Sequence, residues 1–349
     1  MSMVKEFLKK KDIVFSLKRY GIDAMSAMAQ GLFASLLIGT IISTIGTQFG
    51  IGILVQIGDY AKAAAGPAMA VSIALALKCP PLVLFSMVAV GMAANTLGGA
   101  GGPLAVLVVT LIAAECGKLV SKETKVDIIV TPFVSIAVGV LLSILCAPYI
   151  GKAASWVGEI IKWATNQQPL LMGIIVSVVV GIALTLPISS AAICAALSLT
   201  GLAGGAALAG CCAQMVGFAV MSFKENGVGG LVSQGIGTSM LQMGNIVRNP
   251  KIWIPPILAS AITGPVATCI FSLEMNGPAI SSGMGTCGLV GQIGVYTGWV
   301  NDATKTITAF DWIGLVMISV ILPAIITPVI AHFCRKAGWI KQGDLKLTN

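Results

Sequence analysis

Apolar residues dominate this chain so strongly that they decide what it can fold into. Of its 349 residues, 56% are hydrophobic and only 10% are charged, and the mean hydropathy is +0.96. A soluble globule needs more polar surface than this composition supplies. Because a membrane-crossing helix takes roughly 20 apolar residues, the chain has room for about eight to ten crossings joined by short loops. The sequence therefore predicts an all-α polytopic membrane protein without a large soluble domain.

The basic residues predict how the chain is oriented. A formal net charge of +8 and a pI near 9.1 would suggest nucleic acid as the partner of a soluble protein. Here Lys and Arg gather at the two ends and in a few loops, which is a topology signal, so we expect no nucleic-acid partner. Residues 1–20 mix six basic residues with apolar ones, which predicts an interfacial amphipathic helix on the lipid bilayer. Residues 335–349 carry four more basic residues, so we expect both termini in the cytoplasm.

The first half, residues 21–150, is predicted to form a scaffold membrane unit. Spans are expected at about 22–47, 51–78 (in two pieces), 82–95, 104–119 and 128–150. One stretch stands apart, the Gly-rich tract from Asn95 to Pro103. Since Gly and Pro cannot continue a helix that faces lipid, the tract should be buried or line water. Asn95 is therefore a candidate for the substrate pathway, and a plain turn between packed helices is the alternative.

An amphipathic connector is predicted at residues 151–168, where Trp156 and Trp163 have a spacing typical of membrane interfaces. Residues 169–334 should form a second membrane unit that binds and transports the substrate. Its first crossings are expected at Leu170–Leu186, Ala191–Leu208 and Gly210–Phe223.

Two Gly-rich tracts in this second half, residues 227–240 and 283–292, each lie near a lone glutamate. Gly allows a backbone to approach a ligand, so the tracts predict broken helices and re-entrant hairpins. An ionisable side chain at membrane depth is a functional candidate by default, the alternative being a cap or a surface charge in a loop. Carboxylates and amides suit sugar hydroxyls. The candidate substrate-binding residues are Glu225, Asn226, Gln234, Glu274, Asn276, Thr286 and Gln292, together with Asn95. If the two tracts converge on one cavity, Glu225 and Glu274 should both contribute to binding.

Three strings in this region carry a resemblance. They are Glu225-Asn226-x-x-Gly229-Gly230, Asn249-Pro250-x-Ile252-Trp253-Ile254-Pro255-Pro256, and Gly283-Met284-Gly285-Thr286-x-Gly288-Leu289-Val290-Gly291-Gln292. These strings resemble the membrane-spanning IIC subunit of the sugar phosphotransferase system, in the type-2 IIC or toxin-regulator branch. The Gly-Ile-x-Glu motif of many glucose-superfamily members is absent, since Gly235-Ile236-Gly237-Thr238 has no Glu.

The resemblance implies the glucose-superfamily IIC fold, with a scaffold, a connector and a mobile transport unit containing two hairpins. It implies a permease subunit in the bacterial inner or plasma membrane, paired as a homodimer through its first half. It also implies that separate IIA and IIB proteins supply the phosphoryl group to the sugar.

Other functions stay open on the residues alone. A membrane regulator that senses a small molecule is one alternative, and a secondary transporter coupled to protons or sodium through Glu225 or Glu274 is another. The chain shows no catalytic residue set, so enzyme activity on this chain stays uncertain. No Cys/His ligand spacing is present, and the nine cysteines are scattered in apolar segments, so we expect neither a metal nor another cofactor.

Overall fold

The structure is a computed structural model that describes residues 2–347, with side chains from residue 5 onward. Its contacts divide the chain into two compact units, Met1–Ala153 and Ala154–Asn349. Within the described residues the chain is helical and forms no β-strand, apart from an isolated bridge between Gly201 and Met275. The prediction of an all-α polytopic membrane protein is confirmed.

Six helical stretches of the described chain are long and apolar enough to cross a membrane, and two shorter apolar helices accompany them. One of the six, Pro81–Val120, folds back on itself at Gly99, whose φ is +51°. A Cβ on Gly117 would lie 2.9 Å from Val83, and one on Gly102 would lie 2.6 Å from Asn95 Oδ1. These contacts require the two halves of the stretch to run antiparallel.

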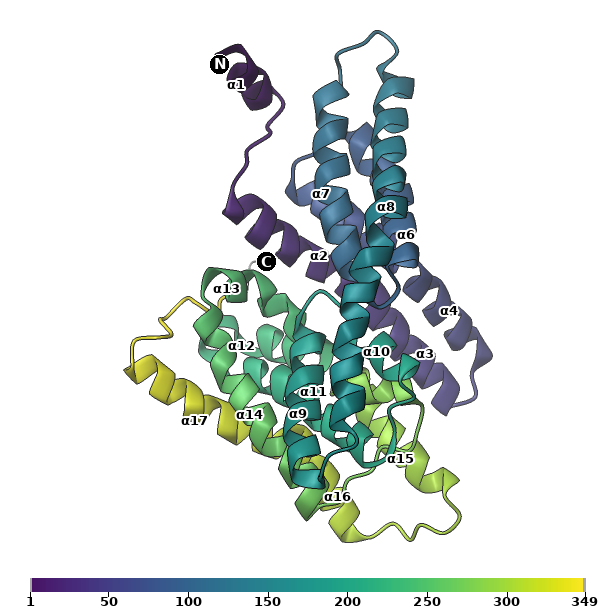
Figure 1. The fold of residues 1–349 in the computed structure, drawn as a ribbon, viewed down its shortest axis with the longest axis vertical. Helices are drawn as coiled ribbons and strands as arrows, with labels where there is room; N and C mark the ends of the chain where they lie inside the picture. Colours follow the sequence, from purple (N-terminus) through teal and green to yellow (C-terminus); the bar gives the residue numbers. More distant parts are fainter. Residues whose placement is uncertain (1, 348–349) are drawn as a thin grey trace. The chain divides into compact units, whose positions relative to one another are not determined.

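Figure 1 shows the helices of the first unit, most of them labelled. They are α1 (Ser2–Lys10), α2 (Ala24–Leu32), α3 (Ile38–Gln48), α4 (Gly52–Ala63), α5 (Ala65–Ala76), α6 (Pro81–Gly98), α7 (Gly102–Val120) and the first part of α8 (Asp127–Ala164), which continues into the second unit after Ala153, with π-helical turns η1 (Lys18–Asp23) and η2 (Phe33–Leu37) and the 3-10 turn η3 (Gly99–Gly101). The helices pack as neighbouring pairs, α3 with α4, α2 with α5, α5 with α6 and α6 with α7.

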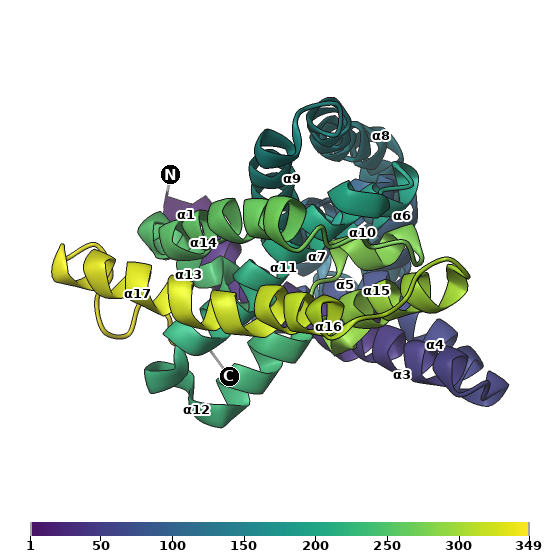
Figure 2. The ribbon, with the colours of Figure 1, turned by 90° about the horizontal axis from the view of Figure 1, so that it is seen from below.

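The second unit alternates long helices with short, irregular ones. Its long helices are α9 (Pro169–Thr185), α11 (Gly201–Met221), α14 (Ile254–Pro265) with η7 (Val266–Ile270), and α15 (Val290–Asn301). Its last crossing consists of α16 (Ala309–Val316), η10 (Met317–Ile321) and α17 (Leu322–Lys336), which Figure 2 shows as one rod. The short elements are α10 (Ser190–Ala196), α12 (Phe223–Val232), η4 (Ser233–Gly237), η5 (Ser239–Gln242), α13 (Met243–Arg248), η6 (Pro250–Trp253), η8 (Ala279–Gly283) and η9 (Cys287–Leu289).

Helix α11 is the centre of the second unit and packs against α9, α14 and α17. Small residues let the backbones approach closely, as they do in other membrane helix pairs. A Cβ on Gly210 would lie only 1.8 Å from the carbonyl oxygen of Ser177 on α9. Gln214 is fully buried in α11, and its Oε1 accepts a hydrogen bond from Trp253 Nε1 at 2.9 Å. This dense packing supports the irregular segments around it.

Three helix boundaries differ from those expected. Residues 1–20 are not one helix, because α1 ends at Lys10, Asp12 adopts φ +52° and the next helical turn begins at Lys18. Helix α8 does not end at residue 150 but continues through Gly151 into the predicted connector 151–168 and ends at Ala164. The expected crossing Ala191–Leu208 is broken instead at Ser198, where φ is +49°, and α11 begins afresh at Gly201.

Candidate functional site: two hairpins and a polar pocket

The first irregular segment, residues 222–249, forms a re-entrant hairpin that we call the first hairpin. The chain passes through α12, η4, the extended Thr238, η5 and α13, with a kink at Gly227 (φ +60°). Asn226 near its start and Asn249 at its end both hydrogen-bond to the C-terminal segment, so the hairpin begins and ends on one side. At its tip, the Ser239 hydroxyl lies 2.8 Å from that of Thr185 on α9.

The second irregular segment, residues 272–301, is the second hairpin. It descends as the irregular stretch 272–289, turns through Gly285, Gly288 and Leu289, all with φ between +52° and +59°, and returns as α15. Glu274 at its start and Asp302 just after its end line the same pocket, so this hairpin also begins and ends on one side.

The tips of the two hairpins meet. The Thr286 hydroxyl donates a hydrogen bond to the carbonyl oxygen of Gly235, and both Thr286 and Gln234 are buried. Gln292, at the start of α15, donates to the Ser319 hydroxyl at 2.9 Å on the last crossing. The two Gly-rich tracts therefore contact each other at Thr286 and Gly235.

The two glutamates do not converge with them. Glu225 accepts a hydrogen bond from Arg335 Nη2 at 3.3 Å, near the end of α17, whereas the Glu274 pocket includes Asp311, near the start of α16. These two partners lie near opposite ends of the 28-residue stretch Ala309–Lys336, which spans about 40 Å at 1.5 Å per residue. Glu225 and Glu274 therefore do not share one cavity, because the two hairpins begin at opposite ends of the unit.

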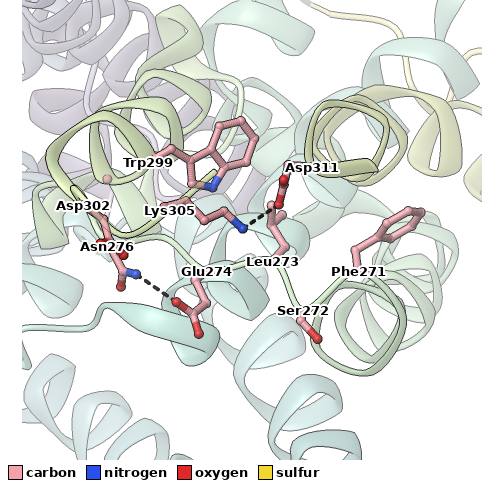
Figure 3. A pocket seen from close by; sticks show the side chains of 10 residues that line it. Phe271, Ser272, Leu273, Glu274, Asn276, Trp299, Asp302, Lys305 and Asp311 are labelled. Carbon is pink, nitrogen blue, oxygen red and sulfur yellow. Dashed lines mark hydrogen bonds and ion pairs between the residues drawn. The ribbon is translucent and has the colours of Figure 1, made fainter. Parts of the chain in front are cut away.

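The Glu274 pocket has a volume of about 230 Å³. Figure 3 shows the Asn276 amide directed at the Glu274 carboxylate, with the Trp299 indole at the opposite wall. The Asn276 Nδ2 donates to Glu274 Oε2 at 2.9 Å, while the Asn276 Oδ1 accepts from the N–H of Gly201 at 3.1 Å. Asn276 therefore fixes the carboxylate to the start of α11. The remaining lining residues are Phe271, Ser272, Leu273, Gly298, Asp302, Lys305 and Asp311.

Charge in this pocket is mostly negative. Three carboxylates, Glu274, Asp302 and Asp311, face one ammonium group, Lys305, which pairs with Asp311 at 2.7 Å. Hydrogen bonds from the Thr304 side chain and N–H lower the pKa of the Asp302 carboxyl from its ordinary value, so this group is an anion at neutral pH. The pocket thus offers several hydrogen-bond acceptors beside an aromatic side chain.

Glu225 belongs to a different polar group, which we call the amide cluster. Its members are Glu225, Asn226, Gln234, Gln242 and Asn245. Asn245 Nδ2 donates to Gln242 Oε1 at 2.7 Å, and Gln242 Nε2 donates to Gln234 Oε1 at 2.9 Å. Gln234 Nε2 in turn donates to the Ser222 hydroxyl at 2.9 Å. The cluster connects both arms of the first hairpin.

The structure thus distributes the predicted site residues over four places. Glu274 and Asn276 line the pocket, and Glu225, Asn226 and Gln234 belong to the amide cluster. Thr286 and Gln292 lie on the second hairpin, where Thr286 contacts the first hairpin and Gln292 contacts Ser319 on the last crossing. Asn95 lies half-buried in α6 of the first unit.

Sequence reasoning missed Gln242 and Asn245 in the cluster and Trp299, Asp302 and Lys305 in the pocket. Asp302 and Lys305, two charged residues of opposite sign that follow α15, were the sequence feature from which the pocket could have been predicted. Among the described residues no group of His, Cys, Asp or Glu could hold a metal ion, and the nine cysteines are free thiols.

Opposed hairpins inside a bundle of apolar helices are an arrangement of multi-pass membrane transport proteins. A family model described as "Phosphotransferase system, EIIC" matches residues 22–347, and the chain belongs to this family. It is therefore in general terms a permease component of a sugar phosphotransferase system, and the family implies IIA and IIB partner proteins. Neither the curated proteins nor the solved structures contain a match to this chain.

Proposed function

We propose that this chain carries an uncharged sugar or polyol across the bacterial cell membrane as the IIC component of its phosphotransferase system, and that the Glu274 pocket is where the sugar first binds. The observation that carries the proposal is the pocket itself. Sugar hydroxyls donate well to carboxylates, and Asn276 holds the Glu274 carboxylate in place. Trp299, which is buried and packs edge-on against Trp312, contributes to the pocket wall.

The charge of the pocket supports an uncharged substrate. With three carboxylates against one lysine, the site repels sugar acids and phosphorylated sugars.

The orientation proposed for transport follows from the basic residues. Arg248, Lys251, Arg335 and Lys336 all lie on the side where the first hairpin begins, which supports a cytoplasmic location for that side and for the C-terminus. The six basic residues among residues 1–20 independently support a cytoplasmic N-terminus. The Glu274 pocket then opens on the outer side. The first hairpin faces the side from which a IIB protein would act. The fold division proposed here keeps residues 21–150 as the scaffold and residues 169–334 as the transport unit, with a homodimer formed through the scaffold.

A thermal-shift screen of the purified chain tests the proposal, since a ligand that binds only the folded state raises its unfolding temperature. The panel contains neutral hexoses, pentoses and polyols, sugar acids and sugar phosphates. We expect stabilisation by a neutral member and none by its acid or phosphate. Stabilisation by charged members alone would overturn the proposal. Uptake of the stabilising sugar into proteoliposomes should then depend on added IIA and IIB proteins, and uptake driven by a proton or sodium gradient alone would favour a secondary transporter.

A further inference from the structure

The chain's own C-terminal segment, residues 340–347, lies across the amide cluster. The Leu345 carbonyl oxygen accepts hydrogen bonds from Asn226 Nδ2 at 2.8 Å and from Gln242 Nε2 at 3.0 Å. The Leu345 N–H donates to Glu225 Oε2 at 3.0 Å. Both main-chain groups of one residue are therefore bound by side chains of the first hairpin.

The next two residues are held in the same way. The Lys346 carbonyl oxygen accepts from Asn245 Nδ2 at 3.0 Å, and the Leu347 N–H donates to Asn226 Oδ1 at 2.8 Å. The Asn226 amide thus binds the segment through both of its ends, as a neighbouring strand would. Of residues 345–347 only Leu345 is buried, and the Lys346 side chain is exposed. All of the hydrogen bonds from the cluster to these residues go to the peptide main chain.

The segment is joined to α17 by a turn suited to detachment. Gly338 and Gly343 adopt φ of +72° and +94°, and no atom lies within 4 Å of a Cβ built on either. Asn249 closes the turn by donating to the Trp339 carbonyl oxygen at 3.0 Å and to Asp344 Oδ2 at 2.8 Å. Apart from Ile340 and Leu345, the segment buries no large apolar side chain.

If the segment dissociated, several side chains of the amide cluster would lose hydrogen-bond partners. Gln242 is fully buried, and one of its two N–H bonds is used by Leu345. Asn226, Asn245 and Glu225 would each lose a partner as well. Buried donors and acceptors of this kind require replacement by water, peptide or hydroxyl groups.

We propose that the amide cluster is a binding site for extended peptide main chain, and that residues 340–347 are its removable occupant. While the segment is bound, it covers the amides of the first hairpin on the side of Arg335. Its release opens them to the substrate on that side. This closing role rests on the proposed transport function, whereas recognition of the peptide main chain does not.

The first test uses a fluorescent peptide with the sequence of residues 340–347 and the full chain purified in detergent. The double variant Leu345→Pro/Leu347→Pro removes both N–H donors of the segment. Its matched control, Leu345→Met/Leu347→Ala, keeps them. We expect the peptide to bind the proline variant at least tenfold more tightly than the control, whose own segment competes. Adding Asn226→Ala and Gln242→Ala to the proline variant should abolish this binding. Equal binding to all three proteins, or none to the proline variant, would overturn the proposal.

Hydrogen exchange tests the proposal even if the proline variant fails to fold, because it leaves the C-terminal segment itself unchanged. The amides of Leu345 and Leu347 should exchange at least tenfold faster in Asn226→Ala than in the parent chain. Unchanged exchange would contradict main-chain recognition by Asn226.

A separate measurement tests the closing role. Uptake of the sugar that stabilises the protein should be faster in the proline variant and should slow again when the peptide is added from the Arg335 side. If neither the proline substitutions nor the added peptide alters the uptake rate, the closing role is overturned, whereas the proposal of peptide binding is unaffected. Conversely, a loss of sugar recognition by the Glu274 pocket would leave the peptide result unaffected, so the two failures are distinguishable.

Discussion

Thr286 is the residue through which the two hairpins touch, because its hydroxyl donates to the Gly235 carbonyl oxygen in a buried environment. Replacement by Val keeps the shape and leaves that carbonyl without this donor, which costs about 1–3 kcal/mol. We expect Thr286→Val to lower the thermal unfolding temperature by several degrees, and Thr286→Ser to restore most of it. A Val variant as stable as the parent would show that the tips do not depend on this hydrogen bond.

Single residues were predictable where their chemistry is unusual for a membrane. Glu274 could be predicted as a candidate because an isolated charged side chain is rare in an apolar sequence. Gln242 and Asn245 give no such signal, because an amide in a short helix is common and their partners lie about 100 residues later in the chain. Glu225 was found for its charge, yet its partners, Arg335 and the Leu345 N–H, could not be foreseen.

At the scale of elements, the close approach of α9 and α11 depends on Gly210. A Cβ there would lie 1.8 Å from the Ser177 carbonyl oxygen, a backbone atom that cannot move without its helix. We expect Gly210→Ala to force the helices apart and to lower the unfolding temperature by several degrees or prevent folding. Gly229→Ala is the matched control, since no atom lies within 4 Å of its Cβ. Equal effects of the two substitutions, measured by thermal unfolding in detergent, would refute this account of the packing.

The hairpins were predictable as elements, because Gly-rich backbone at membrane depth must turn inside protein. The side of the unit on which each hairpin begins could not be predicted. It depends on the last crossing, whose Arg335 pairs with the first hairpin and whose Asp311 lines the pocket at the start of the second hairpin. Connector and helix boundaries also escaped prediction. Helix α8 continues through Gly151, where a Cβ would meet the Gly98 carbonyl oxygen at 2.6 Å, so the glycine permits close packing at this position.

At the scale of the whole molecule, the account predicts the sidedness of the chain. Cysteines introduced for Lys305 and Lys341, both exposed, should react with a membrane-impermeant reagent from opposite sides of sealed vesicles. Lys341 should react from the cytoplasmic side. Labelling of both positions from one side would contradict the proposed topology.

The resemblance to the family also predicts an oligomeric state. By family resemblance the protein should be a homodimer joined through its first half. Cross-linking in native membranes should trap dimers through cysteines placed on exposed positions of the first unit and not through those around the Glu274 pocket. Recovery of monomers alone would count against the dimer.

The central claim, that the substrate binds beside Glu274, is tested most directly by measuring the affinity of the stabilising sugar for Glu274→Gln. Loss of the hydroxyl-binding carboxylate should weaken binding roughly ten- to a hundredfold without changing the fold. Glu159→Gln, an exposed site on α8, should bind as the parent does, and Glu225→Gln should change affinity little at the outer pocket. Unchanged affinity in Glu274→Gln together with lost affinity in Glu225→Gln would move the site to the first hairpin and contradict the account.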